Sequence, residues 1–128
     1  MEEYLSINRY RFKSEFPLLE KQYPILNKIV PPMQHACALL IDLAKTKGYN
    51  RITIFGSSVT WKFRNNSDLD ICIDASFEPE LLMKQVTEAL AELPIEFDLI
   101  CWNTLNSPLL RSEIEKGVVI YDRSIDAG

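Results

Sequence analysis

The stretch of sequence that decides the fold is residues 52–74, ITIFGSSVTWKFRNNSDLDICID. It begins as an apolar run, passes through Gly56 and Ser57, and crosses a polar loop into a second apolar run that carries Asp68 and Asp70. Short apolar runs bounded by glycine, serine and asparagine are typical of buried β-strands. The pattern therefore predicts two strands joined by a loop that starts with Gly-Ser.

The second run carries two aspartates that are two positions apart. Successive side chains of a strand point to opposite faces, so Asp68 and Asp70 share one face while Leu69 and Ile71 take the other. Like charges this close raise each other's pKa, which favours a cation between them. A solvated acidic edge strand would show the same pair of aspartates. The neighbouring motifs are therefore needed to distinguish a cation-binding site from such a strand.

A third acidic strand is predicted at residues 95–102, IEFDLICW, where Glu96 and Asp98 fall on one face. Both are candidates for a third carboxylate, and Asp98 is preferred because it lies deeper in the apolar run. If this strand lies beside the one with Asp68 and Asp70, three carboxylates meet, which is enough to hold two magnesium ions.

The Gly56-Ser57 turn lies one loop away from these acids. Such a turn can present backbone N–H groups to a phosphate, although most Gly-Ser pairs are simple tight turns. A phosphate-binding turn close to a metal-binding group of acids indicates phosphoryl or nucleotidyl transfer.

These motifs together resemble the signature of the polymerase-β-type nucleotidyltransferase superfamily, and in particular its minimal nucleotidyltransferase (MNT) branch. The residues that carry the resemblance are Gly56-Ser57, Asp68-Leu69-Asp70, and Asp98 within the segment FDLI. The tail, residues 110–122 (LRSEIEKGVVIYD), is similar to the closing helix and strand of those small domains. The similarity covers roughly residues 32–122.

The resemblance implies a reaction and roles for the residues. Asp68, Asp70 and Asp98 would hold two Mg²⁺ ions, and Asp98 could also accept the proton of the acceptor. Gly56 and Ser57 would hold the β- and γ-phosphates of a nucleoside triphosphate, with ATP expected. Attack of an acceptor hydroxyl on the α-phosphate would then transfer a nucleoside monophosphate and release pyrophosphate.

The chain departs from the family pattern directly after the Gly-Ser pair. Many members have an arginine-containing turn there, whereas this chain reads Ser58-Val59-Thr60-Trp61. Lys62 and Arg64 follow a few residues later and could take over as nucleotide-binding cations. Such a role depends on whether the side chain reaches the phosphates more than on its position in the sequence.

The acceptor follows only from the resemblance. MNT domains often accompany a helical protein of the HEPN type and act as its antitoxin by nucleotidylating it, so a HEPN-type partner is expected. Two alternatives stay open. The chain could neutralise such a partner by contact alone, which the missing arginine favours, or it could modify a small molecule as the aminoglycoside nucleotidyltransferases do.

Composition narrows the function classes further. The 128 residues predict one domain, and a net charge of −4 without a long basic run argues against binding to duplex DNA. The three cysteines form no CxxC pair, so neither a zinc site nor a disulfide framework is expected. No apolar stretch is long enough to cross a bilayer, and a cytoplasmic location is expected.

The order of predicted elements indicates an α/β (α+β) fold, a small mixed β-sheet backed by helices. An N-terminal extension, residues 1–31, is expected to contain one short helix and to pack on an MNT domain of residues 32–128. Ser107 and Pro108 read as the start of a helix. The expected elements are a helix at 33–47, strands at 51–55 and 69–74 with a helical turn at 59–63 between them, a helix at 79–92, a strand at 95–102, a helix at 108–116 and a strand at 118–121.

Overall fold

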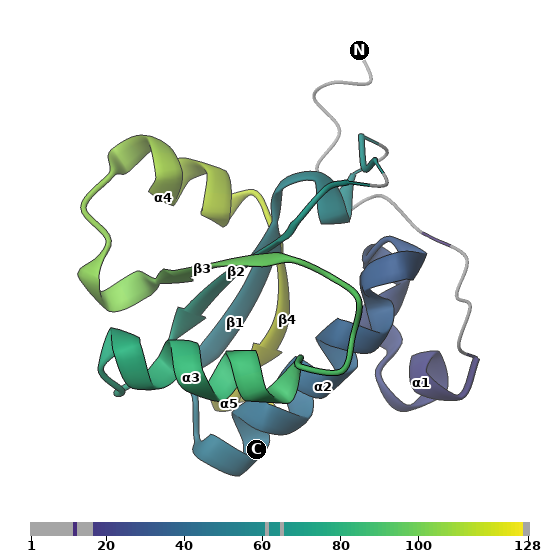
Figure 1. Ribbon diagram of the computed structural model, residues 1–128, viewed down its shortest axis with the longest axis horizontal. Helices are drawn as coiled ribbons and strands as arrows, with labels where there is room; N and C mark the ends of the chain where they lie inside the picture. The colour runs from purple at the N-terminus through teal and green to yellow at the C-terminus, as the bar shows by residue number, and fades with distance from the viewer. Residues whose placement is uncertain (1–11, 13–16, 61, 65, 127–128) are drawn as a thin grey trace.

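A four-stranded sheet with the strand order β3-β2-β1-β4 forms the centre of the molecule (Figure 1). The computed structural model describes Phe12 and residues 17–60, 62–64 and 66–126. Their elements are α1 (Pro17–Gln22), η3 (Pro24–Lys28), α2 (Pro31–Lys47), β1 (Arg51–Phe55), η4 (Gly56–Val59), β2 (Leu69–Asp74), α3 (Pro79–Ala89), β3 (Phe97–Cys101), η5 (Trp102–Thr104), α4 (Pro108–Glu115), β4 (Val118–Asp122) and α5 (Arg123–Asp126).

The sheet is mixed, as the sequence predicts. Strand β1 pairs antiparallel with both β2 and β4, whereas β2 and β3 run parallel. A parallel pair needs a crossover connection, and α3 supplies it between β2 and β3. The expected α+β fold with a small mixed sheet is therefore confirmed.

Two helix boundaries follow from local sequence. Helix α2 ends at Gly48, whose φ of 76° is left-handed and whose N–H donates to the carbonyl of Ala44. Helix α4 begins after Ser107, whose hydroxyl accepts a hydrogen bond of 3.2 Å from the N–H of Leu110, with Pro108 in the first turn. Both boundaries match the sequence prediction.

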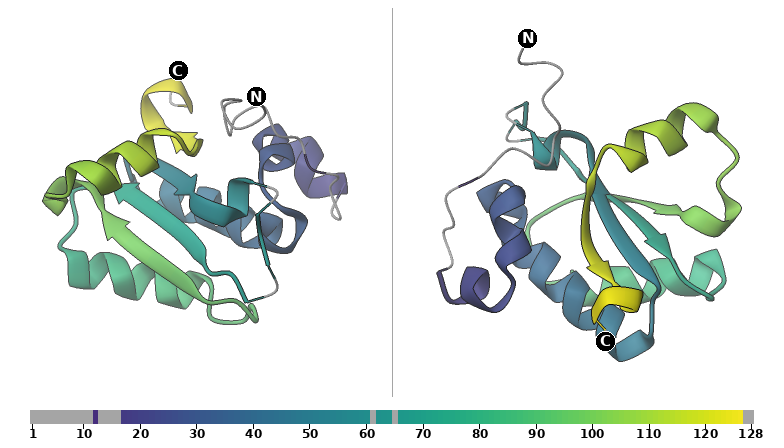
Figure 2. Two further views of the ribbon diagram at one scale, coloured as in Figure 1. Left: turned by 90° about the horizontal axis from the view of Figure 1, so that it is seen from above. Right: turned by 180° about the vertical axis from the view of Figure 1, so that it is seen from behind.

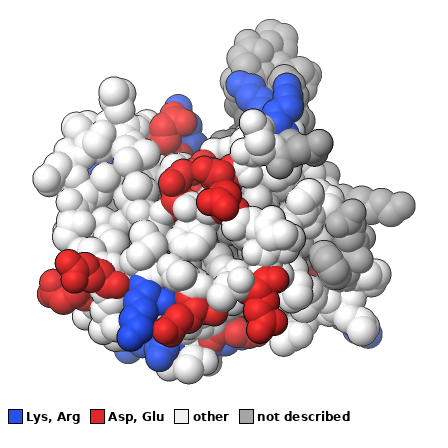
Figure 3. Space-filling model, viewed as in Figure 1, with Lys and Arg blue, Asp and Glu red and all other residues white. Residues whose placement is uncertain are grey.

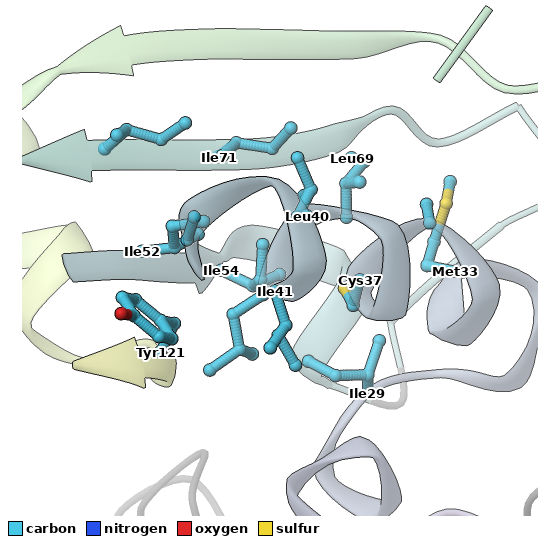
Figure 4. Packing of buried hydrophobic residues seen from close by; sticks show 14 of the residues in the cluster. Ile29, Met33, Cys37, Leu40, Ile41, Ile52, Ile54, Leu69, Ile71 and Tyr121 are labelled. Carbon is cyan, nitrogen blue, oxygen red and sulfur yellow. The ribbon is translucent and has the colours of Figure 1, made fainter. Parts of the chain in front are cut away.

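The main core lies between the sheet and helix α2, with α3 on the same face (Figures 2 and 4). Ile52, Ile54, Leu69, Ile71 and Ile73 point from the strands into this core and are fully buried. Each such side chain contributes about 1.5–3 kcal/mol by burial. The residues that alternate with them along the strands therefore point to the opposite face of the sheet.

The opposite face of the sheet carries a much smaller cluster, made of Phe55, Cys72 and Ile114. Ile114 comes from α4, which lies on this side (Figure 2, left). We call this side the open face, because α4 packs on only part of it. The side chains that the sequence singles out lie here.

Several boundaries differ from the sequence prediction. The helical turn after β1 occupies Gly56–Val59 rather than 59–63, because Gly56 takes a φ of 74° and turns the chain at once. Strand β3 covers only Phe97–Cys101. Helix α3 ends at Ala89 instead of residue 92, with Pro94 close downstream.

The segment before α2 forms two short helical elements, α1 and η3, where one was expected. Leu26, Ile29 and Val30 from this segment belong to the main core. The division into an extension at 1–31 and a domain at 32–128 stays a prediction, and residues 1–11 and 13–16 lie outside the described part. None of the helices in the described part is long and apolar enough to span a membrane.

Candidate active site

Asp70 and Asp98 lie side by side on the open face. They are register partners in the parallel pair of β2 and β3, and Asp70 also faces Phe55 of β1. Neighbouring strands are about 4.8 Å apart, and register partners show their side chains on the same face. The predicted meeting of two acidic strands is therefore present, and Figure 3 shows acidic side chains gathered near the centre of this view of the surface.

Asp68 lies directly before β2 and completes a group of three aspartates. Its charge acts on Asp70, whose pKa is raised above the usual value by burial first, and then by the negative charges of Asp98 and Asp68. Asp98 is exposed, whereas Asp68 and Asp70 are half-buried. The three carboxylates thus share one electrostatic environment with an excess of negative charge.

Gly56 lies against the carboxylate of Asp70. A Cβ atom at this position would overlap with Oδ2 of Asp70 and would lie 3.3 Å from its Cγ. The left-handed φ of 74° disfavours any other residue as well. The backbone of the Gly-Ser turn is therefore held next to the acids, which is the juxtaposition that the sequence predicts.

The loop after this turn holds Lys62 near Ser57. The hydroxyl of Thr60 donates to the carbonyl of Ser57 over 3.4 Å and accepts a bond of 3.1 Å from the N–H of Lys62. The guanidinium of Arg64 instead donates to two carbonyls of its own loop, those of Lys62 and Phe63. Both cationic side chains are exposed. Trp61, between them and the turn, lies outside the described residues.

Ser58 begins the stretch, residues 58–61, that replaces the arginine-containing turn of many family members. Its side chain is fully buried, and its Oγ has no hydrogen-bond partner among the described residues. Its carbonyl accepts a bond of 2.8 Å from the N–H of Val30. This side chain thus points away from solvent and cannot replace an arginine on a phosphate.

Glu96, the competing candidate for the third acid, precedes β3. It lines a pocket of about 200 Å³ together with Asp68, Met33 and Phe63. Its charge does not contribute to the raised pKa of Asp70, whereas the charge of Asp98 does. The structure therefore places Asp98, rather than Glu96, beside the central carboxylate.

In the described ranges, no three histidine, cysteine, aspartate or glutamate side chains are close enough to form a ready-made metal site. The donor set nevertheless suits Mg²⁺, which prefers carboxylate oxygens and binds proteins through one or two of them, completed by water and phosphate. The pKa of Asp70 is raised by burial first, and then by the negative charges of Asp98 and Asp68 beside it. A bound divalent cation would compensate these charges.

The sequence analysis missed a cationic and aromatic cluster on the same face. The guanidinium carbon atoms of Arg111 and Arg51 lie 4.5 Å and 5.6 Å from the ring centroid of Trp102. Arg51 also pairs with Asp74 at 4.0 Å. The alternation of Arg51, Thr53 and Phe55 along β1 would have placed Arg51 on the face of the acids, but the contribution of α4 needed the tertiary structure.

A larger hollow, of about 530 Å³, lies elsewhere on the molecule, between η3, α2 and β4. Tyr23, Ile25 and Val119 are among the residues that line it. None of the residues that the sequence analysis assigns to the site lines this hollow.

Solved structures with a similar fold contain toxin–antitoxin proteins. The chain aligns with a chain of a toxin–antitoxin crystal structure with AMP-PNP at a TM-score of 0.59 and 20% identity, over 70% of this chain and 76% of the other. A mutant MntA–HepT toxin–antitoxin gives a TM-score of 0.57 at 18% identity, over 68% and 73%. Tri-AMPylated Shewanella oneidensis HEPN toxin in complex with MNT antitoxin gives 0.54 at 19%, over 74% and 76%.

The sequence itself matches a family model. The model is described as polymerase beta, nucleotidyltransferase, and it matches residues 40–126, which include β1, the Gly-Ser turn and all three aspartates. No curated protein sequence matches the chain. The resemblance noted from the motifs is thus confirmed by the family match, and the similar folds are those of MNT antitoxins. The chain belongs to the polymerase beta nucleotidyltransferase family.

Proposed function

We propose that this protein transfers a nucleoside monophosphate from a magnesium-bound nucleoside triphosphate to a hydroxyl group of a HEPN-type partner protein. The observation that carries the proposal is the arrangement of Gly56, Asp70 and Asp98. The backbone of Gly56 touches the carboxylate of Asp70, which is the register partner of Asp98. Phosphate-binding backbone and metal-binding carboxylates are thereby adjacent.

Asp68, Asp70 and Asp98 are the residues that would hold magnesium. Bound there, the metal would neutralise charge on the phosphates and on the leaving pyrophosphate. Asp70 is half-buried and lies between the other two acids, and its pKa is raised by burial and by the charges of Asp98 and Asp68. A cation bound beside it would favour its ionised form.

The η4 turn would hold the β- and γ-phosphates. Its first residue, Gly56, brings the backbone close to the acids, and the N–H groups that follow lie at the start of the turn. Lys62, whose backbone is linked through Thr60 to Ser57, is better placed than Arg64 to add a cation. The guanidinium of Arg64 is bound to its own loop.

Asp98 is the carboxylate that suits the acceptor. It is exposed at the start of the edge strand β3, so an incoming hydroxyl can reach it from solvent. In the transfer, a bond forms between the acceptor oxygen and the α-phosphorus while the bond from that phosphorus to the bridging oxygen of pyrophosphate breaks. The hydroxyl proton passes to Asp98 or to water, and pyrophosphate leaves with the electron pair.

The choice of acceptor rests on the comparisons. One similar structure holds a tri-AMPylated HEPN toxin in complex with an MNT antitoxin. Another contains AMP-PNP, an ATP analogue, which supports ATP as the donor for this chain. Sequence identities near 20% support a similar fold, and an experiment is needed to identify the acceptor.

The test is incubation of the protein with magnesium and each labelled nucleoside triphosphate, with and without a HEPN-type protein, sought first among the products of the neighbouring genes. Label should appear on the partner, with ATP as the best donor, and should vanish in the Asp70→Asn variant. Absence of label on the partner with every nucleotide, in a sample whose complex is intact, would contradict the proposal.

Burial of Ser58 favours a second candidate, a module that neutralises its partner by contact alone. The stretch after the Gly-Ser pair, residues 58–61, contains no arginine, and the side chain of its first residue, Ser58, is turned into the interior. In that case the Asp70→Asn variant would inhibit the partner as well as the unaltered protein does. Loss of inhibition in Asp70→Asn, with binding retained, supports transfer instead.

A further inference from the structure

The open face continues beyond the acids into a surface that the proposed reaction does not yet use. Asp98 is followed on the same face by Ile100 and then by Trp102, roughly 13 Å further along at about 3.3 Å per residue. Leu105 and Leu110 flank them, and all four apolar side chains are only partly buried. Figure 3 shows a broad uncharged area over η5 and α4, beside the acidic patch.

Arg111 adds a single cation to this surface. Its guanidinium stacks on Trp102, and its Nη2 donates a bond of 2.9 Å to the carbonyl of Leu105. Among the described residues, no carboxylate lies within ion-pair distance of it, whereas Arg51 on the same ring is paired with Asp74. A guanidinium fixed by stacking, with donors left over, is preorganised to bind an anionic group.

We propose that this surface, defined by Ile100, Trp102, Leu105, Leu110 and Arg111, docks the acceptor protein, and that Arg111 binds an acidic side chain of that protein. The inference rests on the proposed function, because that function places the nucleotide and the acceptor on opposite sides of Asp70. Gly56 marks the triphosphate side, next to β1, and Asp98 marks the acceptor side, at the edge strand. The body of the acceptor then lies along β3 and α4.

Charge favours a protein over a nucleic acid as the occupant. Binding to nucleic acid depends on several cations that contact phosphates. Among the described residues, this surface offers one guanidinium without a carboxylate partner within an apolar area, which is too few cations for contacts to several phosphates. Partly buried aromatic and aliphatic side chains around one arginine are instead the composition of a protein–protein contact.

Two matched pairs of variants test the surface. Arg111→Met keeps the aliphatic stem over Trp102 and removes the charge, and its control is Lys116→Met, at the end of the same helix, where the lysine contacts Glu113 at 3.6 Å. Leu109→Ser changes an 82% exposed side chain at the edge of the surface, and its control is Leu18→Ser on α1, which is also 82% exposed. Thermal melting shows whether each variant is folded.

The measurements are the dissociation constant of the complex with the HEPN-type partner, the KM and kcat of transfer to it, and the affinity for AMP-PNP with magnesium. Arg111→Met should raise the dissociation constant and KM roughly 10- to 100-fold, as expected for loss of a charge-assisted hydrogen bond, and leave nucleotide affinity unchanged. Leu109→Ser should raise both by a smaller factor, Arg111→Lys should restore part of the loss, and the controls should match the unaltered protein.

Equal complex affinity in Arg111→Met and Lys116→Met would overturn the proposal, and so would a loss of nucleotide affinity in Arg111→Met, which would place Arg111 at the nucleotide. Binding of an RNA oligonucleotide that depends on Arg111 would overturn it in favour of a nucleic acid. If the unaltered protein binds its partner but transfers no label, the proposed function fails, while the complex affinities still decide whether the surface docks the partner.

Discussion

Gly56 and Asp70 are in direct contact, because the space that a Cβ atom of residue 56 would need is filled by Oδ2 of Asp70. The contact joins the end of β1 to the start of β2 and sets the Gly-Ser turn beside the acids. Gly48 offers a comparison, since its φ of 76° is equally left-handed but nothing lies within 4 Å of a Cβ atom there.

Gly48→Ala should therefore cost only the left-handed backbone conformation, about 1–2 kcal/mol of unfolding free energy. Gly56→Ala should cost about 1–3 kcal/mol more, since the added methyl group overpacks the carboxylate, and it should abolish transfer. Chemical denaturation of both variants measures the difference. Equal losses of stability would mean that the carboxylate of Asp70 moves aside without cost.

Asp70 gives the stability of the metal-free protein a specific pH dependence. Its pKa is raised in the folded state, so its contribution to stability is complete below the unfolded-state pKa and is lost as pH rises through the folded pKa. In EDTA, Asp70→Asn should match the unaltered protein at acidic pH and melt at a higher temperature near neutral pH. Magnesium should reduce this difference by stabilising the unaltered protein.

Asp122 provides a control of opposite sign. Hydrogen bonds from the hydroxyl and N–H of Ser124 lower its pKa, so its contribution is present above the unfolded-state pKa and is lost as pH falls through the folded pKa. Asp122→Asn should lower the melting temperature at neutral pH and converge with the unaltered protein in acid. If both variants shift the melting temperature in the same direction near neutral pH, the assignment of charge strain to Asp70 is wrong.

Asp98 and Glu96 differ in what they can do for transfer. Asp98→Asn should lower kcat by orders of magnitude because it removes a charge beside Asp70 and the carboxylate nearest the acceptor side. Glu96→Gln should leave kcat nearly unchanged, since Glu96 precedes β3 and its charge is not among those that raise the pKa of Asp70. Initial rates at saturating nucleotide and magnesium compare the two, and the reverse ranking would transfer the role to Glu96.

Lys62 is expected to bind the triphosphate in place of the missing arginine. Lys62→Ala should weaken nucleotide affinity by about 1.5–3 kcal/mol, as expected for a hydrogen bond to a charged group. Arg64→Ala should have the smaller effect, because the guanidinium of Arg64 already donates to the carbonyls of Lys62 and Phe63. Calorimetric titration with AMP-PNP and magnesium distinguishes the two, and unchanged affinity in the double variant would exclude both residues.

The sequence predicts those parts of the fold that depend on local patterns. Alternation along residues 69–74 and 97–101 fixes which face carries Asp70 and Asp98, and Ser107 and Gly48 mark helix ends through their own backbone preferences. The predicted position of the helical turn after β1 was wrong, because the chain turns already at Gly56, where only a residue without a Cβ atom fits beside Asp70 of β2. Contacts between segments that lie far apart in the sequence leave no pattern in the local sequence.

The same reason explains the part of the open face that was missed. Nothing in the sequence around Trp102 indicates that Arg51 and Arg111 lie over its ring. Arg51 comes from β1, and Arg111 comes from α4, the helix after β3. Gly117 allows α4 to approach β1, because a Cβ atom at residue 117 would lie 2.5 Å from the carbonyl oxygen of Ile54. Such an approach is a property of the packed fold.

The central claim is that the three aspartates and the Gly-Ser turn together bind a magnesium-bound nucleotide. Calorimetric titration of AMP-PNP into the unaltered protein and into Asp70→Asn, each with magnesium and with EDTA, tests it most directly. We expect binding only to the unaltered protein in the presence of magnesium. Equal affinity in all four titrations, or no binding to the unaltered protein with magnesium and its partner present, would contradict the claim.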